Sequence, residues 1–172
     1  KVGRLHVKGL WDGKPNPVRA LIYFIFYQLA FRPILNKIGF NRLKIALSAG
    51  APLPPEVMAL WQIYGLNLSE FYGQTETGGA IIAAQEGDFP RPGHVGVPPA
   101  GWEVKLSKDG EILVKGKDLF ECYLNNPEGT REVLDSDGWL HTGDVGEWTP
   151  DGNLKIIDRA RDIIVTSGGK TI

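Results

Sequence analysis

The sequence predicts a fold of the class α/β plus β, in which an α/β layer is followed by a small antiparallel, barrel-like β unit. Two observations predict it. A strand–helix–strand pattern across residues 43–71 is typical of a parallel sheet covered by helices. Beyond about residue 85, prolines and glycines separate several short strands, which is typical of a small antiparallel sheet. The predicted parts are the C-terminal portion of an α/β subdomain at 1–90, a β subdomain at 91–157, a hinge at 158–162 and the first strand of a C-terminal α+β domain at 163–172.

The first predicted element is a helix at residues 18–38, with a break or kink near Pro33 because proline lacks the amide donor that a helix interior needs. Its longest apolar run, residues 18–31, contains Arg19 and Gln28 and is too short to span a bilayer. The pattern favours a buried or half-buried helix over the alternative, a helix on a membrane surface.

The parallel layer follows this helix. Pro54 and Pro55 open a helix because proline is tolerated in a first helical turn, and Gly65 marks the end of that helix. The predicted elements are, in order, a strand at 43–47, a loop at 48–52, a helix at 54–64 and a strand at 66–71.

The antiparallel unit is predicted from turn signals at residues 108–110 and 150–152, each of which contains an Asp-Gly pair. Residues 158–162 carry four charged side chains in five positions, which is poor core material and predicts a solvated joint. The predicted elements are strands at 103–106, 111–115, 139–142, 145–149, 153–157 and 163–166, and a helix at 126–134.

Composition excludes some classes of function. Lys plus Arg number 19 and Asp plus Glu 20, so a net charge of −1 gives no electrostatic reason to expect a nucleic-acid partner. The single cysteine, Cys122, cannot form an internal disulfide, which permits a reducing, cytosolic setting.

One candidate site is the segment at residues 72–79, which gathers glycines, threonine hydroxyls and one carboxylate directly after a strand. Glycine lets a backbone approach a ligand closely. A hydroxyl can bond a phosphate, the Glu76 carboxylate can hold Mg²⁺ beside it, and the Tyr72 ring can cover a flat base. On composition alone, a glycine-rich turn whose threonines satisfy the backbone is the favoured interpretation.

A second candidate segment, residues 137–144, ends at Asp144. An aspartate beside glycine at a strand bend can present both carboxylate oxygens to a vicinal diol, and a carboxylate that holds a ribose is a known solution elsewhere. An aspartate that caps a turn is the common alternative.

A third segment contains Gly169-Lys170-Thr171, which invites a phosphate-loop interpretation. We reject it because Ile164 stands where that motif needs glycine. The three histidines lack the spacing of metal ligands, and His141 is most simply a satisfied strand residue.

In their order along the chain, these segments resemble the adenylate-forming superfamily of acyl- and aryl-CoA ligases, firefly luciferases and peptide-synthetase adenylation domains. The resemblance covers residues 18–172 and reverses the preference for a plain turn at 72–79. The segment that leads into the first strand is most similar to long-chain fatty acyl-CoA ligases. The motifs resemble the adenine loop at 48–53, the nucleotide-site signature at 72–76, the ribose motif at 138–144, and the hinge and following loop at Asp158-Arg159 and Gly168-Gly169.

The resemblance implies a role for each motif residue. Thr75 would contact the α-phosphate and Glu76 would hold Mg²⁺, which makes these two the catalytic candidates. Arg161 would be the pivot of the hinge. The remaining implied contacts are with the adenine, from Gly50, Ala51, Pro52, Tyr72 and Gly73; with the ribose, from Asp144 and Arg159; and with the pantetheine of coenzyme A, from Gly168 and Gly169.

The implied activity has two steps. The carboxylate of an acid attacks the α-phosphorus of ATP, with Mg²⁺ offsetting the charge, and the thiol of coenzyme A then displaces AMP. The expected partners are therefore ATP, Mg²⁺, coenzyme A and a carboxylic acid, specifically a long-chain fatty acid. Two alternatives stay open: an acyl-AMP ligase that loads a carrier protein, and a nucleotide-binding or interaction module without chemistry of its own.

Location and completeness are further expectations. A cytoplasmic location is expected, with peripheral membrane contact because acids with long apolar tails partition into membranes. Neither Lys1 nor Ile172 resembles a natural terminus, which predicts an internal fragment. The sequence lacks the phosphate loop and the C-terminal lysine of the superfamily, so this chain alone is predicted to be inactive.

Overall fold

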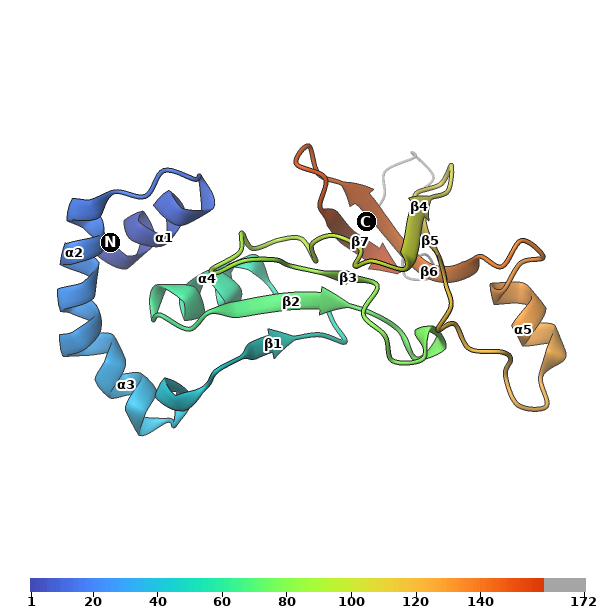
Figure 1. Ribbon diagram of the computed structural model, residues 1–172, viewed down its shortest axis with the longest axis horizontal. Helices are drawn as coiled ribbons and strands as arrows, with labels where there is room; N and C mark the ends of the chain where they lie inside the picture. The colour runs from blue at the N-terminus through green and yellow to red at the C-terminus, as the bar shows by residue number, and fades with distance from the viewer. Residues whose placement is uncertain (160–172) are drawn as a thin grey trace, which may run out of the picture. The chain divides into compact units, whose positions relative to one another are not determined.

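The computed structural model describes residues 1–159 (Figure 1). It contains both the α/β elements and the antiparallel β elements that the sequence predicts, so the predicted fold class is confirmed. The described chain forms two compact units, and strand β2 (Leu68–Tyr72) contributes residues to both. The first unit comprises residues 1–70 and 85–93, and the second comprises residues 71–84 and the described residues from 94 onward.

The first unit combines helices with a short parallel strand pair. β1 pairs in parallel with the start of β2, as the strand–helix–strand pattern predicts, and Ala46 lies opposite Leu68. The intervening helix buries Met58 and Gln62, and the Gln62 amide donates to the carbonyl of Pro90 at 2.9 Å. The elements are α1 (Val2–Trp11), which the sequence analysis did not predict, α2 (Pro17–Phe26), α3 (Arg32–Lys37), a 3₁₀ turn (Phe40–Arg42), β1 (Ala46–Ser48) and α4 (Pro55–Ile63).

The sequence predicts a break or kink near Pro33. The helical segment Pro17–Lys37 is continuous, so there is no break, and the irregularity that the structure shows before the proline is a π-helical turn. A π-helical turn, Tyr27–Phe31, precedes the proline, and the Arg32 amide donates to the Tyr27 carbonyl across this wider turn. The following helix α3 begins at Arg32, directly after the π-helical turn, and holds Pro33 as its second residue.

Most of this segment is exposed and only one side of it is packed, so a fully buried helix is excluded for the described chain, whereas a half-buried one describes it. Its packed side contacts α1 and α4: Tyr23 stacks on His6 with ring centroids 4.3 Å apart, and Phe31 meets the edge of Tyr64 at 4.9 Å. Its other side exposes large apolar side chains, of which Leu29 is 77% exposed. By length and composition alone the 21-residue helix is long and apolar enough to cross a membrane, a test that some soluble core helices also pass, so the prediction that it is too short is corrected.

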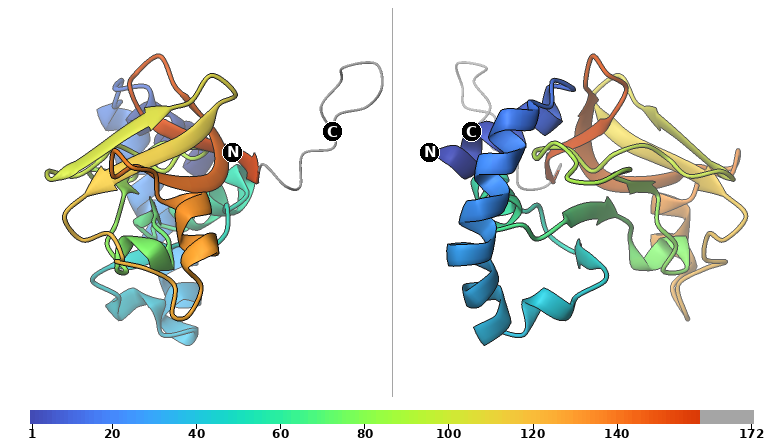
Figure 2. Two further views of the ribbon diagram at one scale, coloured as in Figure 1. Left: turned by 90° about the vertical axis from the view of Figure 1, so that its right-hand side faces the viewer. Right: turned by 60° about the vertical axis from the view of Figure 1, so that its left-hand side comes forward.

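The second unit contains a curled four-stranded antiparallel sheet with the strand order β4-β5-β6-β7 (Figure 2). The end of β2 pairs antiparallel with β3, a two-residue strand that the sequence did not predict. The two strands predicted at 139–142 and 145–149 form one strand, β6. The elements are a 3₁₀ turn (Thr75–Thr77), β3 (Ala83–Ala84), β4 (Trp102–Leu106), β5 (Glu111–Gly116), α5 (Pro127–Val133), β6 (Leu140–Trp148) and β7 (Leu154–Arg159).

The core of the second unit lies between the sheet and the end of β2. Alternate residues of the strands supply it, which is the pattern expected when one face of an antiparallel sheet is buried. Tyr72 is the largest member of this core and also carries the polar group on which the candidate site is built. The cluster consists of Tyr72, Ile82, Ala83, Val95, Ile112, Val114, Leu140 and Leu154.

Candidate nucleotide site

The glycine-rich segment after β2 forms a compact turn. A Cβ atom on Gly73 would lie 2.6 Å from the carbonyl oxygen of Ala80, so no side chain fits at this position without moving the backbone. The buried Thr77 hydroxyl accepts a hydrogen bond from the backbone amide of Gln74 at 3.3 Å and donates one to the Ala80 carbonyl at 2.9 Å. The alternative interpretation, a turn whose threonine satisfies the backbone, therefore describes Thr77 correctly. Thr75 lies in the same turn and is exposed.

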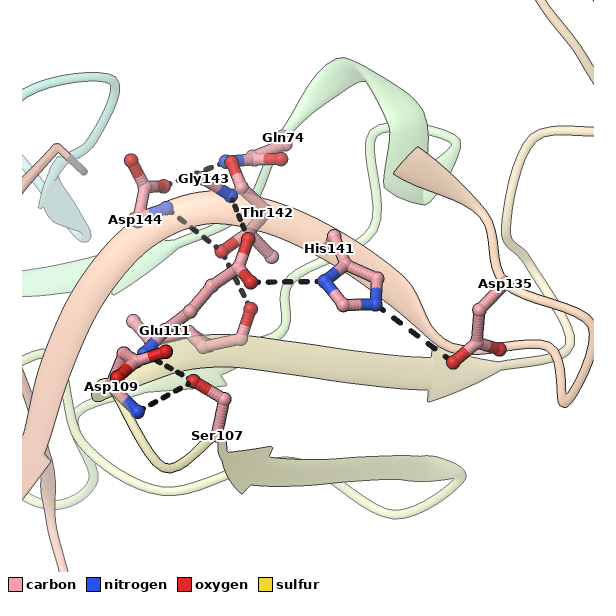
Figure 3. A network of polar contacts seen from close by, with 10 residues as sticks. Gln74, Ser107, Asp109, Glu111, Asp135, His141, Thr142, Gly143 and Asp144 are labelled. Atoms are coloured by element: carbon pink, nitrogen blue, oxygen red, sulfur yellow. Dashed lines mark hydrogen bonds and ion pairs between the residues drawn. The ribbon is translucent and has the colours of Figure 1, made fainter. Parts of the chain in front are cut away.

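Asp144 joins this turn to the four-stranded sheet. Its Oδ2 atom accepts hydrogen bonds from the Tyr72 hydroxyl and from the Gln74 side-chain amide, each at 2.6 Å. Figure 3 shows Gln74 reaching Asp144 from the turn. The side-chain amide of Gln74 also donates to the backbone carbonyl of Thr142 at 3.0 Å. Burial, and then the hydrogen bond to Asp144, raise the pKa of Tyr72, so this phenol is a donor throughout the physiological pH range. The structure thus brings together two candidate segments that are separated in the sequence.

The other carboxylate oxygen of Asp144, Oδ1, has fewer partners than Oδ2 among the described residues. Among residues 1–159, Oδ1 is contacted by the Arg159 guanidinium, whose Nε atom lies 3.4 Å away. The Asp144 side chain is 9% exposed, whereas that of Arg159 is 70% exposed. The two residues lie opposite each other in the pairing of β6 with β7. An ionised carboxylate oxygen accepts about two hydrogen bonds, so Oδ1 retains capacity for a hydroxyl donor.

Glu76 is held by the segment that precedes α5. Its backbone carbonyl accepts the Phe120 amide at 2.8 Å, and its Oε1 atom accepts the Tyr123 hydroxyl at 2.7 Å. That hydrogen bond, together with partial burial, raises the pKa of Tyr123 to about 12. The described residues hold no cluster of three or more potential metal ligands. Mg²⁺ in phosphate-transfer sites is bound by one or two carboxylates together with substrate phosphates, so a single carboxylate at Glu76 fits that ion.

The predicted adenine loop lies in the first unit, directly after β1. Gly50, Ala51 and Pro52 are exposed, and Gly50 has a φ of +86°, a conformation that favours glycine. The loop is connected to the middle of β2, because the Leu53 amide donates to the carboxylate of the buried residue Glu70 at 3.0 Å. Burial raises the pKa of Glu70 and this hydrogen bond opposes the shift. Glu70 was not predicted as a site residue.

Three of the predicted site residues, Arg161, Gly168 and Gly169, lie outside the described residues. The charged joint predicted at 158–162 begins inside β7, which extends to Arg159. Both Asp158 and Arg159 are exposed.

Comparison with known proteins identifies the family. The model of the family described as AMP-binding enzyme matches residues 18–124. The chain belongs to this AMP-binding enzyme family. The resemblance to adenylate-forming enzymes derived from the motifs is thereby confirmed.

Individual relatives agree with this assignment. Over 160 residues the chain is 43% identical to the Arabidopsis thaliana protein named long chain acyl-CoA synthetase 7, peroxisomal, and the match covers 84% of this chain. It is 39% identical over 157 residues to the Mus musculus protein named long-chain-fatty-acid–CoA ligase 5, again over 84% of the chain. The chain spans 23% of the length of each of these curated relatives.

A solved structure supports the fold independently. Bacillus subtilis o-succinylbenzoate coenzyme A synthetase (MenE), in complex with ATP and magnesium ion, superposes with a TM-score of 0.65 at 28% identity. The match covers 83% of this chain and 32% of the MenE chain.

Several polar residues around the candidate site were not predicted: Gln74, Glu111 and Tyr123. Gln74 lies within a motif that the sequence singles out, so its position was a usable signal. Glu111 and Tyr123 act through contacts with residues 30 and 47 positions away in the sequence. No local pattern marks such contacts.

Proposed function

We propose that this chain forms part of the ATP site of an AMP-forming acid–CoA ligase whose substrate is a long-chain fatty acid. The observation that carries the proposal is the hydrogen bonding of Asp144 to both Tyr72 and Gln74. Each of the two segments involved has an ordinary interpretation as a turn. Their convergence fixes one buried carboxylate through Oδ2 and leaves capacity on Oδ1 for one ribose hydroxyl, so Asp144 does not present both of its oxygens to the diol.

In this proposal, Asp144 accepts a hydrogen bond from a ribose hydroxyl through Oδ1, and Arg159 contacts the same sugar. Tyr72 and Gly73 border the adenine, and the absence of a side chain at Gly73 lets the backbone come close to the base. Gly50, Ala51 and Pro52 keep the adenine contacts that the family resemblance implies. The Gln74 amide fixes the orientation of Asp144, since it donates to both Oδ2 and the Thr142 carbonyl.

Thr75 and Glu76 would act on the phosphates. The exposed Thr75 hydroxyl donates to the α-phosphate, and the Glu76 carboxylate holds Mg²⁺, an ion that offsets phosphate charge during the attack. The Tyr123 hydroxyl keeps the Glu76 side chain in place at 2.7 Å. Because the pKa of Tyr123 is raised to about 12, its hydroxyl remains a neutral donor beside the carboxylate at physiological pH.

The reaction follows from these roles. A carboxylate oxygen of the acid forms a bond to the α-phosphorus while the bond to pyrophosphate breaks. The thiol of coenzyme A then gives up its proton and bonds to the acyl carbon, and AMP leaves with the bonding electrons. The chain contributes positioning and electrostatic stabilisation to both steps and forms no covalent intermediate. Arg161 as hinge pivot, with Gly168 and Gly169 beside the pantetheine, remains part of the proposal by resemblance alone.

The choice of a long-chain acid and of coenzyme A is supported by the names of the two relatives. A decisive experiment incubates the full-length natural protein with ATP, Mg²⁺ and palmitate, with either coenzyme A or an acyl carrier protein, and detects products by mass spectrometry. Palmitoyl-CoA is expected. Acylation of the carrier protein alone would establish the alternative ligase, and nucleotide binding without either product would establish the non-catalytic module.

We also propose that the exposed side of the Pro17–Lys37 helix contacts an anionic membrane surface. Its exposed apolar side chains lie in a stretch, residues 13–55, with no aspartate or glutamate. An apolar helix face bordered by cations is the composition of interfacial helices. The cations of this stretch are Lys14, Arg19, Arg32, Lys37, Arg42 and Lys44.

Vesicle sedimentation of the full-length protein tests this contact. Vesicles with phosphatidylglycerol should bind the protein more strongly than pure phosphatidylcholine vesicles, and Leu29→Glu should weaken that binding. Leu124→Glu is the matched control, because Leu124 is 89% exposed and lies in the second unit. No binding by the wild type, or equal effects of the two variants, would refute membrane contact. A fall in thermal stability in Leu29→Glu without vesicle binding would show that protein covers this face.

A further inference from the structure

Strand β6 departs from regular pairing at the residue that carries the candidate site. His141 lies opposite Leu113 and Val145 lies opposite Glu111, so the three residues between His141 and Val145 face the single residue Ile112. This is a bulge, which interrupts the ladder and re-aims a side chain. Its central residue, Gly143, has a φ of +69°, a conformation that favours glycine.

The bulge removes ladder partners from the backbone amides of β6, and side chains replace them (Figure 3). The Gly143 amide donates to Glu111 Oε1 at 3.0 Å, and the Asp144 amide donates to Thr142 Oγ1 at 3.1 Å. The Thr142 hydroxyl donates in turn to the Ile112 carbonyl at 2.7 Å. Two consecutive amides of the bulge are therefore satisfied by side chains.

The Glu111 carboxylate contacts the bulge region through both of its oxygens. While Oε1 accepts the Gly143 amide, Oε2 lies 2.9 Å from His141 Nδ1, on the residue before the bulge. The other ring nitrogen of His141 lies 3.9 Å from Asp135. The backbone of Glu111 is itself fixed, because its amide donates to Ser107 Oγ at 3.0 Å. One carboxylate on strand β5 thus contacts both the residue before the bulge, His141, and the central residue of the bulge, Gly143.

We infer that Glu111 is a positioning residue for the nucleotide ribose: it holds the β6 bulge in the shape that aims Asp144 at the sugar. The inference rests on the proposed ribose contact of Asp144. Glu111 touches neither the nucleotide nor the acid in this account. Its removal should therefore loosen recognition of the ribose hydroxyls and leave the affinity for the acid unchanged.

The choice of substitutions follows from the two contacts. Glu111→Ala removes both. Glu111→Gln keeps one acceptor for the Gly143 amide and offers a donor to the His141 ring, so it should restore most of the function. Glu111→Asp keeps the charge, but its shorter side chain reaches at most one of the two partners, and it replaces Glu111→Ala if that variant does not fold. Glu103→Ala is the matched control, since it removes an exposed carboxylate from strand β4 of the same sheet.

The experiment measures binding of ATP and of 2′,3′-dideoxy-ATP to the full-length protein by calorimetry, and the KM for palmitate. Glu111→Ala should weaken ATP by about fivefold to tenfold, the equivalent of a weakened rather than a lost hydrogen bond to a charged group. Glu111→Ala should leave the affinity for dideoxy-ATP and the KM for palmitate unchanged. Glu103→Ala should leave all three measured quantities unchanged.

The outcomes separate the inference from the proposed function. If the wild type itself does not prefer ATP to dideoxy-ATP, the ribose role of Asp144 is wrong. The ribose contact is established if the wild type prefers ATP to dideoxy-ATP and Asp144→Asn reduces that preference. If a folded Glu111→Ala or Glu111→Asp then keeps the full preference for ATP, the Glu111 inference is wrong. Equal weakening of both nucleotides in the Glu111 variants would also overturn it, because that pattern indicates general destabilisation.

Discussion

Substituting Asp144 by asparagine removes the charge of the proposed ribose ligand and keeps its shape. In the structure one carboxylate oxygen accepts hydrogen bonds from Tyr72 and Gln74, each at 2.6 Å. Asparagine can place its carbonyl oxygen at that position, so the buried Tyr72 hydroxyl keeps an acceptor. Alanine would leave that hydroxyl unsatisfied, which costs about 1–3 kcal/mol. Asp144→Ala would therefore mix a loss of stability with a loss of binding, whereas Asp144→Asn separates them.

The expected magnitude comes from the position of the second oxygen, Oδ1, where asparagine carries an NH₂ group that can donate to a ribose hydroxyl but cannot accept from it. A hydrogen bond to a charged group contributes about 1.5–3 kcal/mol, and one between neutral groups contributes about 0.5–1.5 kcal/mol. The charge of Asp144 then accounts for about 1–1.5 kcal/mol, so Asp144→Asn should raise the Kd for ATP about fivefold to tenfold. Solvent screens this contribution little, because the Asp144 side chain is 9% exposed.

Calorimetric titration of the full-length protein with ATP and with 2′,3′-dideoxy-ATP measures this effect. Asp144→Asn should weaken ATP and leave dideoxy-ATP unchanged, because the dideoxy sugar lacks the hydroxyl partners. Thermal unfolding should show that the variant is folded. An equal loss of affinity for both nucleotides would refute the ribose contact and leave Asp144 a purely structural link between the turn and the sheet.

Three further predictions follow. Glu76→Gln should lower ATP–pyrophosphate exchange at limiting Mg²⁺, and unchanged exchange would remove Glu76 from the metal role. The same substitution should lower the pKa of Tyr123 from about 12 toward its ordinary value of 10.0. Because the folded-state pKa is raised, this hydrogen bond stabilises the fold fully below pH 10, and its contribution is lost as the pH rises through about 12. Carbon-13 NMR of labelled tyrosine measures the shift, and an unaltered pKa would contradict the assigned cause. Gly73→Ala should destabilise the fold by about 1–3 kcal/mol in urea unfolding, because the new Cβ would lie 2.6 Å from the Ala80 carbonyl, and an unchanged unfolding midpoint would show that the turn can relax.

The sequence predicted the type of most elements because their patterns are local. Alternating side chains and Asp-Gly turns located β4, β5 and β7 to within a few residues. The sequence analysis predicted two strands where β6 is one, because glycine at position 143 indicates a break in a strand pattern. The contacts that compensate for the break come from side chains that the local pattern does not indicate. The bulge survives inside one strand because Glu111 and Thr142 supply partners for its amides. That compensation is a tertiary effect, which local propensity does not contain.

The prediction of a break in the helix before β1 was wrong for a related reason. Proline in an apolar helical pattern indicates a break, yet the π-helical turn Tyr27–Phe31 places Pro33 in the first turn of α3. The burial of that helix depends on which surfaces lie against it, and the described residues cover one side only.

Some residues of the candidate site were predictable from local motifs, and others were not. Motif order along the chain was enough to identify Tyr72, Glu76 and Asp144 as candidates. Gln74 lies in a motif and could have been predicted. Glu111 and Tyr123 have no motif of their own, and their side chains reach the site only because the fold brings them close.

ATP–pyrophosphate exchange by the full-length natural protein, measured with butyrate, octanoate and palmitate, tests the central claim most directly. Exchange reports formation of the acyl-adenylate without any need for coenzyme A, so it isolates the chemistry assigned to this site. We predict exchange that requires an acid, that is fastest with palmitate, and that falls in Asp144→Asn at subsaturating ATP. Exchange that is independent of added acid, or no exchange with any of the three acids, would contradict the assignment of this chain to the ATP site of a fatty-acid-activating ligase.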